Sequence, residues 1–257
     1  DAAPVVTASP ASGSTFALGT ATVTVTARDA AGNTSTATFT VTVRDTTPPV
    51  IGAVSNLTAE ATSAAGAVAT YALPTATDGV DAAPTVTAIP ASGSTFALGT
   101  TTVTVTAGDA AGNTSTATFT VTVRDTTPPV IGAVSNLTAE ATSAAGAVVT
   151  FALPTATDGV DAAPVVTASP ASGSTFTLGV TTVTVTARDA AGNSSTATFT
   201  VTVRDATPPV IGAVSNVTAE ATSAAGAVVT FSLPSATDAV DAAPTVTAIP
   251  ASGSTFA

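Results

Sequence analysis

The side chains of this protein that could do chemistry are almost all carboxylates. The 257-residue chain has sixteen Asp and Glu residues against five basic residues, and it has no His or Cys. Without His or Cys, the commonest general bases, thiol nucleophiles and zinc ligands are missing. What remains is the chemistry of oxygen ligands, and a hard cation such as calcium takes about 6–8 of these.

The carboxylates recur at fixed places in a unit of 80 residues. In the first complete copy they are Asp45, Glu60, Asp78, Asp81 and Asp109, and every other acidic residue of the chain is a copy of one of these five. In the second complete copy they are Asp125, Glu140, Asp158, Asp161 and Asp189. Each copy therefore repeats the whole set of candidate ligands.

Four of the five are expected to meet at one end of the folded unit. Asp45 lies in a linker, Asp78 and Asp81 lie in the loop sequence TDGVDAAP, and Asp109 opens the hairpin sequence DAAGN. Glu60 is expected near the opposite pole, facing the cluster of the next copy. Carboxylates ~6 Å apart repel by roughly 3 kcal/mol per pair at an effective dielectric of ~20. The sequence predicts a calcium ion at each junction, with ordinary turn chemistry and solubility as the competing explanation for the Asp residues.

An enzyme is not predicted. A glycosidase needs two carboxylates across a cleft, whereas here the same acids recur in every small unit, and no base stands ready to activate a Ser or Thr. The net charge of −11 opposes contact with a phosphate backbone, so no nucleic acid partner is expected. No apolar run approaches the roughly 20 residues of a transmembrane helix, so no membrane span is expected either. Calcium is the only cofactor predicted.

All six Asn residues precede an x-Ser or x-Thr pair, the acceptor context for N-linked sugars. They fall in two columns of the repeat, one in the hairpin loop and one near the first strands. Ser and Thr are so common here that this context also arises by chance. The candidate glycosylation sites are Asn33, Asn113 and Asn193 in the loop, and Asn56, Asn136 and Asn216 near the strands.

Apolar and polar residues alternate strictly in several short segments. In 115–123, Ala and Phe or Val alternate with Thr, and this period of two indicates a strand with one face on a core. Turn sequences separate six or seven such segments in each copy, which favours an immunoglobulin-like β-sandwich. The aromatic residues are assigned to the core. The predicted inward residues of the first copy are Leu57, Ala59, Ala61, Ala67, Ala69, Tyr71, Leu73, Val103, Val105, Ala107, Ala117, Phe119, Val121 and Val123.

Domain boundaries are placed at the DTTPP and DATPP strings, because consecutive prolines interrupt strand pairing. This gives complete units at 45–124 and 125–204, the C-terminal part of a unit at 1–44 and the N-terminal part of another at 205–257. Two explanations of this phase stay open. The sequence is a window on a longer array, or the partial units complete one another between chains by strand addition.

The ordered motifs DTTPPVI, TAEAT, GAVVTF, PTATD, SGSTF, LGTTTVTVTA and DAAGNTSTATFTVTV resemble the hyalin repeat, or HYR domain. The resemblance covers both complete and both partial units. It implies immunoglobulin-like sandwiches in tandem, in extracellular or cell-surface proteins associated with adhesion. Many members carry cysteines, so this chain is similar to the cysteine-free bacterial versions.

The function predicted is structural. All-β sandwich domains of about 80 residues, arranged as an elongated rod, would form the stalk of a surface adhesin or the body of an extracellular filament. The expected partners are neighbouring copies of the same chain or repeat, with any cell-surface or glycan partner outside this segment. The alternative is a calcium-dependent adhesive module that recognises a glycan or receptor through its loops.

Overall fold

The computed structural model describes residues 3–257, and the regular structure it contains in that range is entirely β. The chain divides into two compact units: the first ends at Arg124 and leaves out Thr62–Ala64, and the second consists of Thr62–Ala64 and Asp125–Ala257. Each unit holds one complete 80-residue repeat and one partial repeat. The strands alternate buried Val, Ala and Phe with exposed Thr, as β-branched residues favour on a pleated, half-buried surface.

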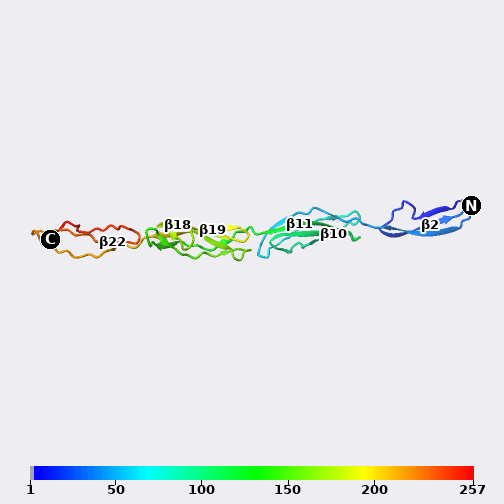
Figure 1. Ribbon diagram of the computed structural model, residues 1–257. Helices are drawn as coiled ribbons and strands as arrows, with labels where there is room; N and C mark the ends of the chain where they lie inside the picture. Colours follow the sequence, from blue (N-terminus) through cyan, green and yellow to red (C-terminus); the bar gives the residue numbers. More distant parts are fainter. Residues whose placement is uncertain (1–2) are drawn as a thin grey trace. The chain divides into compact units, whose positions relative to one another are not determined.

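The complete repeat of the first unit has eight strands in two layers. The larger layer is a four-stranded sheet in the order β5-β11-β10-β8, and the smaller layer pairs β4 with β7 and β6 with β9. Figure 1 labels β10 and β11 of the larger layer. These strands are β4 (Val50–Ile51), β5 (Leu57–Glu60), β6 (Ala67–Val68), β7 (Ala76–Thr77), β8 (Thr85–Ile89), β9 (Thr95–Phe96), β10 (Gly99–Gly108) and β11 (Thr114–Arg124).

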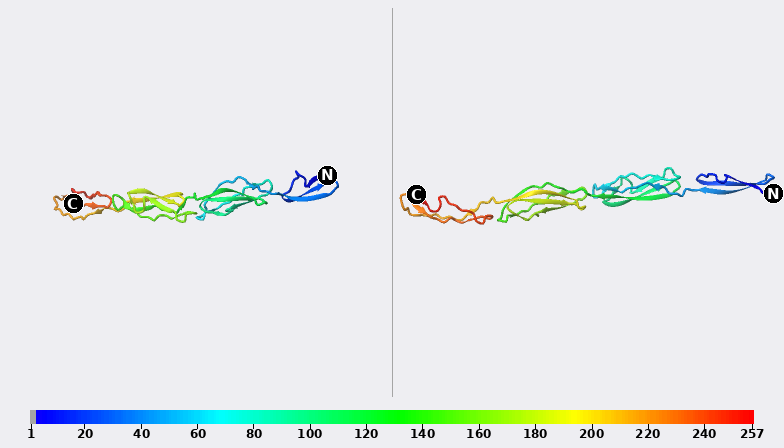
Figure 2. Two further views of the ribbon diagram at one scale, coloured as in Figure 1. Left: turned by 45° about the vertical axis from the view of Figure 1, so that its right-hand side comes forward. Right: turned by 90° about the horizontal axis from the view of Figure 1, so that it is seen from above.

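The complete repeat of the second unit has the same two layers. Its larger sheet runs β13-β19-β18-β16, and its smaller layer pairs β12 with β15 and β14 with β17. This repeat is coloured green to yellow in the two views of Figure 2. The strands are β12 (Val130–Ile131), β13 (Leu137–Glu140), β14 (Ala147–Val148), β15 (Ala156–Thr157), β16 (Val165–Ser169), β17 (Thr175–Phe176), β18 (Gly179–Arg188) and β19 (Ser194–Arg204). The prediction of tandem β-sandwiches of about 80 residues is confirmed.

A parallel pairing ties the beginning of each repeat to its end. The first long strand, β13, runs parallel to the last strand, β19, with Leu137 opposite Val201 and Glu140 opposite Arg204. β19 in turn pairs antiparallel with the whole length of β18. β19 therefore lies between β13 and β18 in the sheet. A repeat without its final hairpin cannot complete this sheet.

The core lies between the two layers. In the second unit it is built from Phe176, Phe199 and a set of valines, and the rings of Phe151 and Phe199 meet edge to face with centroids 5.1 Å apart. Tyr71 and Phe119 make the same contact at 5.0 Å in the first unit. Offset or edge-on ring pairs stabilise a core by about 0.5–1.5 kcal/mol beyond the area they bury.

One inward assignment is wrong. Leu73 is 47% exposed, although Ala67 and Ala69 on the same run are buried. Strand β6 ends at Val68, and the chain re-enters the layer only at Ala76. Between them the main chain of Tyr71 bonds with the side chain of Ser92 instead of a neighbouring strand, so the alternation of side chains is lost before residue 73.

The two partial repeats each hold a part of this sandwich. Residues 3–44 form a three-stranded sheet of β1 (Val5–Ser9), β2 (Gly19–Arg28) and β3 (Thr34–Val43), with β3 at its edge. Residues 205–257 form two short pairs, β20 (Val210–Ile211) with β22 (Ala236–Thr237) and β21 (Ala227–Val229) with β23 (Ser254–Phe256).

Candidate functional site

The structure brings together three carboxylates in each complete repeat. Side-chain oxygens of Asp45, Asp78 and Asp109 lie within 4.8 Å of one another, and so do those of the equivalent triplet Asp125, Asp158 and Asp189. Each triplet joins the linker before the repeat, the loop after β7 or β15 and the final hairpin. Residues that are 64 positions apart in the chain thus share one site.

A tight loop holds Asp78 in place. Its Oδ1 accepts hydrogen bonds from the backbone N–H groups of Val80 at 2.8 Å and Asp81 at 2.9 Å, the short-range pattern that Asp adopts in turns. Its Oδ2 is shielded from solvent and has no hydrogen-bond partner. The equivalent oxygen of Asp158 is also shielded and unpartnered. These two oxygens are the unsatisfied acceptors of the two clusters.

The hairpin supplies the second carboxylate together with an amide that orients it. Asn193 donates from its backbone N–H to Asp189 Oδ1 at 2.8 Å and from Nδ2 to Asp189 Oδ2 at 2.8 Å. The same Nδ2 donates to the backbone carbonyl of Asp125 at 3.2 Å. One amide thus connects the hairpin to the linker, and Asn113 makes the corresponding bonds in the first unit.

The linker carboxylate is anchored by its own turn. Asp125 Oδ1 accepts from the backbone N–H of Thr127 at 3.1 Å, and Asp45 accepts in the same way from Thr47. Asp125 and Asp189 are the two polar residues that are buried among the described part of the chain, at 9% and 6% exposed. Buried carboxylates are costly unless they are paired, hydrogen-bonded or bound to a cation.

The pKa values respond to these bonds. Hydrogen bonds from the backbone N–H groups of Asp81 and Val80 lower the pKa of Asp78 below its ordinary value. Burial acts to raise the pKa of Asp189, but the hydrogen bonds from Asn193 and the loop backbone outweigh it, and the net direction is downward. N–H donors stabilise the charged form of a carboxylate. Both groups are therefore held ionised at neutral pH.

The other predicted ligands lie outside the triplets. Asp81 uses Oδ1 to accept from Ala83 N–H at 3.0 Å and Oδ2 to accept from Ala110 N–H at 2.9 Å, so it ties the loop to the hairpin. Asp161 makes the corresponding bonds in the second unit. These two residues support the site from beside it.

Glu140 lies at the other end of its repeat, on β13. Its Oε1 accepts from Ala206 N–H at 2.8 Å and from the Thr207 hydroxyl at 2.9 Å, and these bonds lower its pKa. Arg204, directly opposite in the parallel pair, acts in the same direction. Glu60 occupies the equivalent position on β5, opposite Arg124. Glu140 thus fastens the end of its repeat to the residues that follow it.

The structural role of the hairpin asparagines is the feature that sequence reasoning missed. Asn113 and Asn193 are assigned above to sugar attachment, yet both side chains are partly buried and bonded to carboxylates. The fixed spacing of four residues in DAAGN was the available signal. In the other column, Asn56 and Asn136 are exposed, and each accepts a hydrogen bond from a strand N–H. Glycosylation of either column stays a prediction.

The donor set fits a hard cation. Every side-chain ligand in a triplet is a carboxylate oxygen. All three carboxylates of each triplet are preorganised by backbone donors, and one oxygen has no other partner. Such oxygen-only sets suit calcium, whereas zinc prefers nitrogen and sulfur. Asp125, Asp158 and Asp189 would hold the ion in the second unit, and it would neutralise their mutual repulsion.

Comparison with known proteins places this chain in a family. The model of the HYR domain matches residues 1–43, 44–123 and 124–203, most of the chain. The protein therefore belongs to the HYR domain family, as three tandem copies without cysteine. HYR domains are non-enzymatic repeats, typically extracellular and related to adhesion.

Similar solved structures include protocadherin gamma B7 (18% identity, 73% of this chain and 58% of that chain, TM-score 0.33). Protocadherin gamma B2 is 19% identical over 72% of this chain and 58% of its own, with a TM-score of 0.35. Human desmocollin-1 is 13% identical over 82% of this chain and 56% of its own, with a TM-score of 0.31. The chain thus spans less than two thirds of the length of these structures. A search of curated proteins found no match.

Residues 3–257 contain no helix that is long and apolar enough to cross a lipid bilayer.

Proposed function

We propose that this protein is a structural segment of an extracellular assembly, either the stalk of a surface adhesin or the body of a filament. The observation that supports this most directly is the repetition of one self-contained sandwich, with the same core, at 45–124 and 125–204. Repeats of this kind act as spacers whose length follows the number of copies. The units 1–44, 45–124, 125–204 and 205–257 are its domains or parts of domains.

The mechanical role can be tested by unfolding the complete repeats under force. Each repeat should resist extension through a parallel strand pair, β5 with β11 or β13 with β19. The two strands of the pair must slide past each other before the repeat can open. Pulling the chain from its ends should give two equivalent unfolding events. Each should release ~250 Å, because 80 residues extend to about 3.6 Å each and the folded repeat already spans roughly 40 Å. Events of unequal length, or unfolding without a force peak, would contradict the proposal.

We also propose that the carboxylate triplets bind calcium. The support is the shielded, unpartnered Oδ2 of Asp158 beside two buried carboxylates, Asp125 and Asp189, together with the matching arrangement at Asp78. An ion there would join the linker, the loop and the hairpin of one repeat. It would stabilise the folded state, because the triplet does not exist in the unfolded chain.

Calorimetric titration of the metal-free chain tests this directly. Calcium should bind and raise the melting temperature, and Asp158→Asn should remove one of the binding events while the site at Asp78 remains. Asp241→Asn is the matched control, because Asp241 is exposed and lies outside both triplets. Absence of binding heat, with an unchanged melting temperature in excess calcium, would exclude the cation and leave the structural role untouched.

A further inference from the structure

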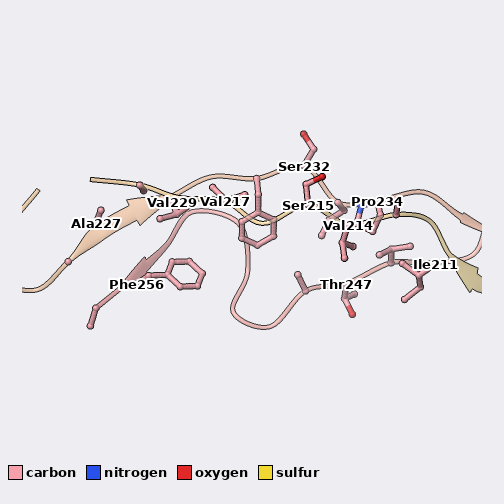
Figure 3. Close-up of a pocket in the computed structure, with 18 of the residues that line it drawn as sticks. Ile211, Val214, Ser215, Val217, Ala227, Val229, Ser232, Pro234, Thr247 and Phe256 are labelled. Atoms are coloured by element: carbon pink, nitrogen blue, oxygen red, sulfur yellow. The ribbon is translucent and has the colours of Figure 1, made fainter. Parts of the chain in front are cut away.

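A small hollow on the second complete repeat is lined by a cation as well as by polar and apolar side chains. It encloses about 300 Å³, and its lining residues are Val165, Thr167, Thr186, Arg188 and Asp189. Ligand pockets begin at about this size. By contrast, the apolar hollow of Figure 3, between Ile211 and Phe256, has no charged side chain in its lining. The small hollow can therefore select a ligand by charge, which the apolar one cannot.

The strand register puts four of these side chains on one face of the larger sheet. Val165 lies opposite Arg188 across the antiparallel pair of β16 and β18, and Thr167 lies opposite Thr186. Directly opposite side chains point to the same side of a sheet, and so do residues two apart along a strand. Val185, which alternates with them on β18, is fully buried in the core. The four side chains therefore stand on the outer face.

Arg188 is a cation without a partner. Within residues 3–257 its guanidinium makes no ion pair or hydrogen bond, whereas Arg204 lies opposite Glu140. A Cβ on Gly192 would lie 3.3 Å from Nη2 of Arg188, so the guanidinium rests against the hairpin backbone. Val165, directly opposite Arg188, is 66% exposed. Five N–H donors are thus held at one end of the hollow, next to an apolar surface.

The two threonines supply one acceptor and one donor. Thr167 donates its hydroxyl hydrogen to the backbone carbonyl of Thr186 at 3.4 Å, which leaves the Thr167 hydroxyl oxygen as an acceptor. The Thr186 hydroxyl has no partner within residues 3–257, so its hydrogen is available to a ligand. The hollow can therefore pair with hydroxyl groups as well as with an anion.

The fold does not need the cation. In the first complete repeat the positions of Val165 and Arg188 are taken by Thr85 and Gly108, which lie opposite each other in the same register. There the Thr85 hydroxyl donates to the Gly108 carbonyl at 3.2 Å. Both repeats form the same two-layered sandwich. Arg188 is therefore a feature of the second repeat's surface, and the packing of the sandwich does not explain it.

We propose that this hollow binds an acidic sugar, such as a uronic acid unit of a glycan. The planar guanidinium of Arg188 pairs with the sugar carboxylate through two parallel N–H···O bonds. Thr186 donates to one sugar hydroxyl, Thr167 accepts from another, and Val165 covers the C–H surface of the ring.

A singly charged ligand suits the surroundings of the site. Asp189 lines the hollow, and the chain has a net charge of −11, so a doubly charged group such as phosphate would be repelled more strongly than a carboxylate. The inference goes beyond the proposed structural function, because it makes the second repeat a binding module as well as a spacer.

Titration of the ¹⁵N-labelled chain with glucuronate, in the presence of a chelator, tests the site. Every sample carries Arg28→Ala, because Val5 and Arg28 repeat the Val165–Arg188 pair and would add a second response. Backbone N–H signals of the lining residues should shift together with one affinity. Signals of the Thr85–Gly108 strand pair should stay in place, and a chain whose lining residues do not respond would overturn the proposal.

Variants of Arg188 separate the guanidinium from charge in general. Arg188→Ala should weaken glucuronate binding by about 10-fold or more, because a charged hydrogen-bonded pair is lost. Arg188→Lys should weaken it as well, since an ammonium group lacks the planar fork. Arg124→Ala is the matched control: it removes the same charge from a residue opposite Glu60 in the other repeat, and it should leave binding unchanged. Equal binding by Arg188→Ala would contradict the site.

The choice of probe tests the class of ligand. Glucuronate should bind about 10-fold more tightly than either acetate or glucose, because each of these offers only part of the set of contacts. Thr186→Val should weaken the binding of glucuronate but not that of acetate. Acetate that binds as tightly as glucuronate would show a site for any carboxylate, including a peptide terminus, and glucose 6-sulfate that binds equally well would remove the preference for a carboxylate. Either result would overturn the assignment to an acidic sugar.

Transfer of the site to the first repeat gives a positive test. Gly108 lacks the positive φ that favours glycine, and the nearest atoms to a Cβ there lie 3.7 Å away, so an arginine fits. Thr85→Val with Gly108→Arg should add a second glucuronate site, seen as new shifts in β8 and β10. An unchanged first repeat with an unchanged melting temperature would mean that these residues do not make the site. Neither outcome affects the unfolding under force or the calcium titration.

Discussion

The side-chain amide of Asn193 lies 3.2 Å from the main-chain carbonyl of Asp125, across 68 residues of sequence. Through this bond the last hairpin of a repeat holds the linker with which the same repeat begins. The amide also orients the carboxylate of Asp189. Asn193, whose sequence context suggests a sugar acceptor, therefore holds two members of the carboxylate triplet in place.

Asn193→Ala should lower the melting temperature of its repeat. The substitution removes the bonds to Asp189 and to the Asp125 carbonyl. The loss of one such partly buried bond corresponds to a shift of roughly 4–8 °C in a domain of this size. Asn193→Asp should be worse at neutral pH, because it adds a carboxylate beside Asp189, and milder in acid. Scanning calorimetry measures both, and a larger effect of Asn193→Asp in acid would contradict the assignment.

Phe199→Ala should destabilise its repeat by about 3–5 kcal/mol, because it opens a cavity where the ring meets Phe151. Phe39→Ala is the matched control. Phe39 occupies the same place in the sequence repeat but is 53% exposed, so its replacement should cost little. Denaturant unfolding followed by far-ultraviolet circular dichroism gives the free energy of unfolding of both variants. Similar losses from the two substitutions would mean that the layers do not form the core described.

Gly146→Ala should cost at least about 2 kcal/mol. Gly146 has a φ of +107°, and a Cβ there would collide with the carbonyl oxygen of Phe176. Gly159→Ala should be neutral or slightly stabilising, since a Cβ at Gly159 meets nothing within 4 Å and Ala239 stands at the equivalent position of the next copy. Equilibrium unfolding compares the two variants, and equal stability would refute the close approach at Gly146.

The repeats should lose stability in acid. The pKa of Asp78 is lowered from 3.8 by hydrogen bonds from Asp81 and Val80, and that of Glu140 is lowered from 4.5 by Ala206 and Thr207. A lowered folded-state pKa means that the unfolded chain binds more protons. The stabilisation is therefore complete above about pH 5 and declines as the pH falls below 4.5 through the folded-state values.

Melting temperatures in the presence of a chelator, from neutral pH downward, measure this dependence. Asp78→Asn should flatten the acid limb and lower the melting temperature at neutral pH. A melting temperature that rises below pH 4.5 in the wild-type chain would contradict the sign of both shifts.

Much of the fold could be predicted because the determinants are local. The alternation of Val and Thr in β10 and β11 sets which side chains face the core, and the turn sequences at 91–94 and 109–113 end the strands where the structure ends them. Alternation fails as a guide at Leu73, where a side-chain bond from Ser92 replaces strand pairing. No local sequence pattern shows that the main chain of Tyr71 bonds with a side chain instead of with a neighbouring strand.

The sequence alone determined the repeat, the strand-forming pattern and the five carboxylate columns, since each depends on the order of residue types along a short stretch. Only the tertiary structure decided which carboxylates meet. The tertiary structure brings Asp45, Asp78 and Asp109 together. It places Asp81 where backbone N–H groups bind its carboxylate, and it places Glu140 at the far end of the repeat. The reason is physical: a few ångströms of loop placement separate a shared site from a hydrogen-bonded turn, and that placement is set by contacts between residues remote in sequence.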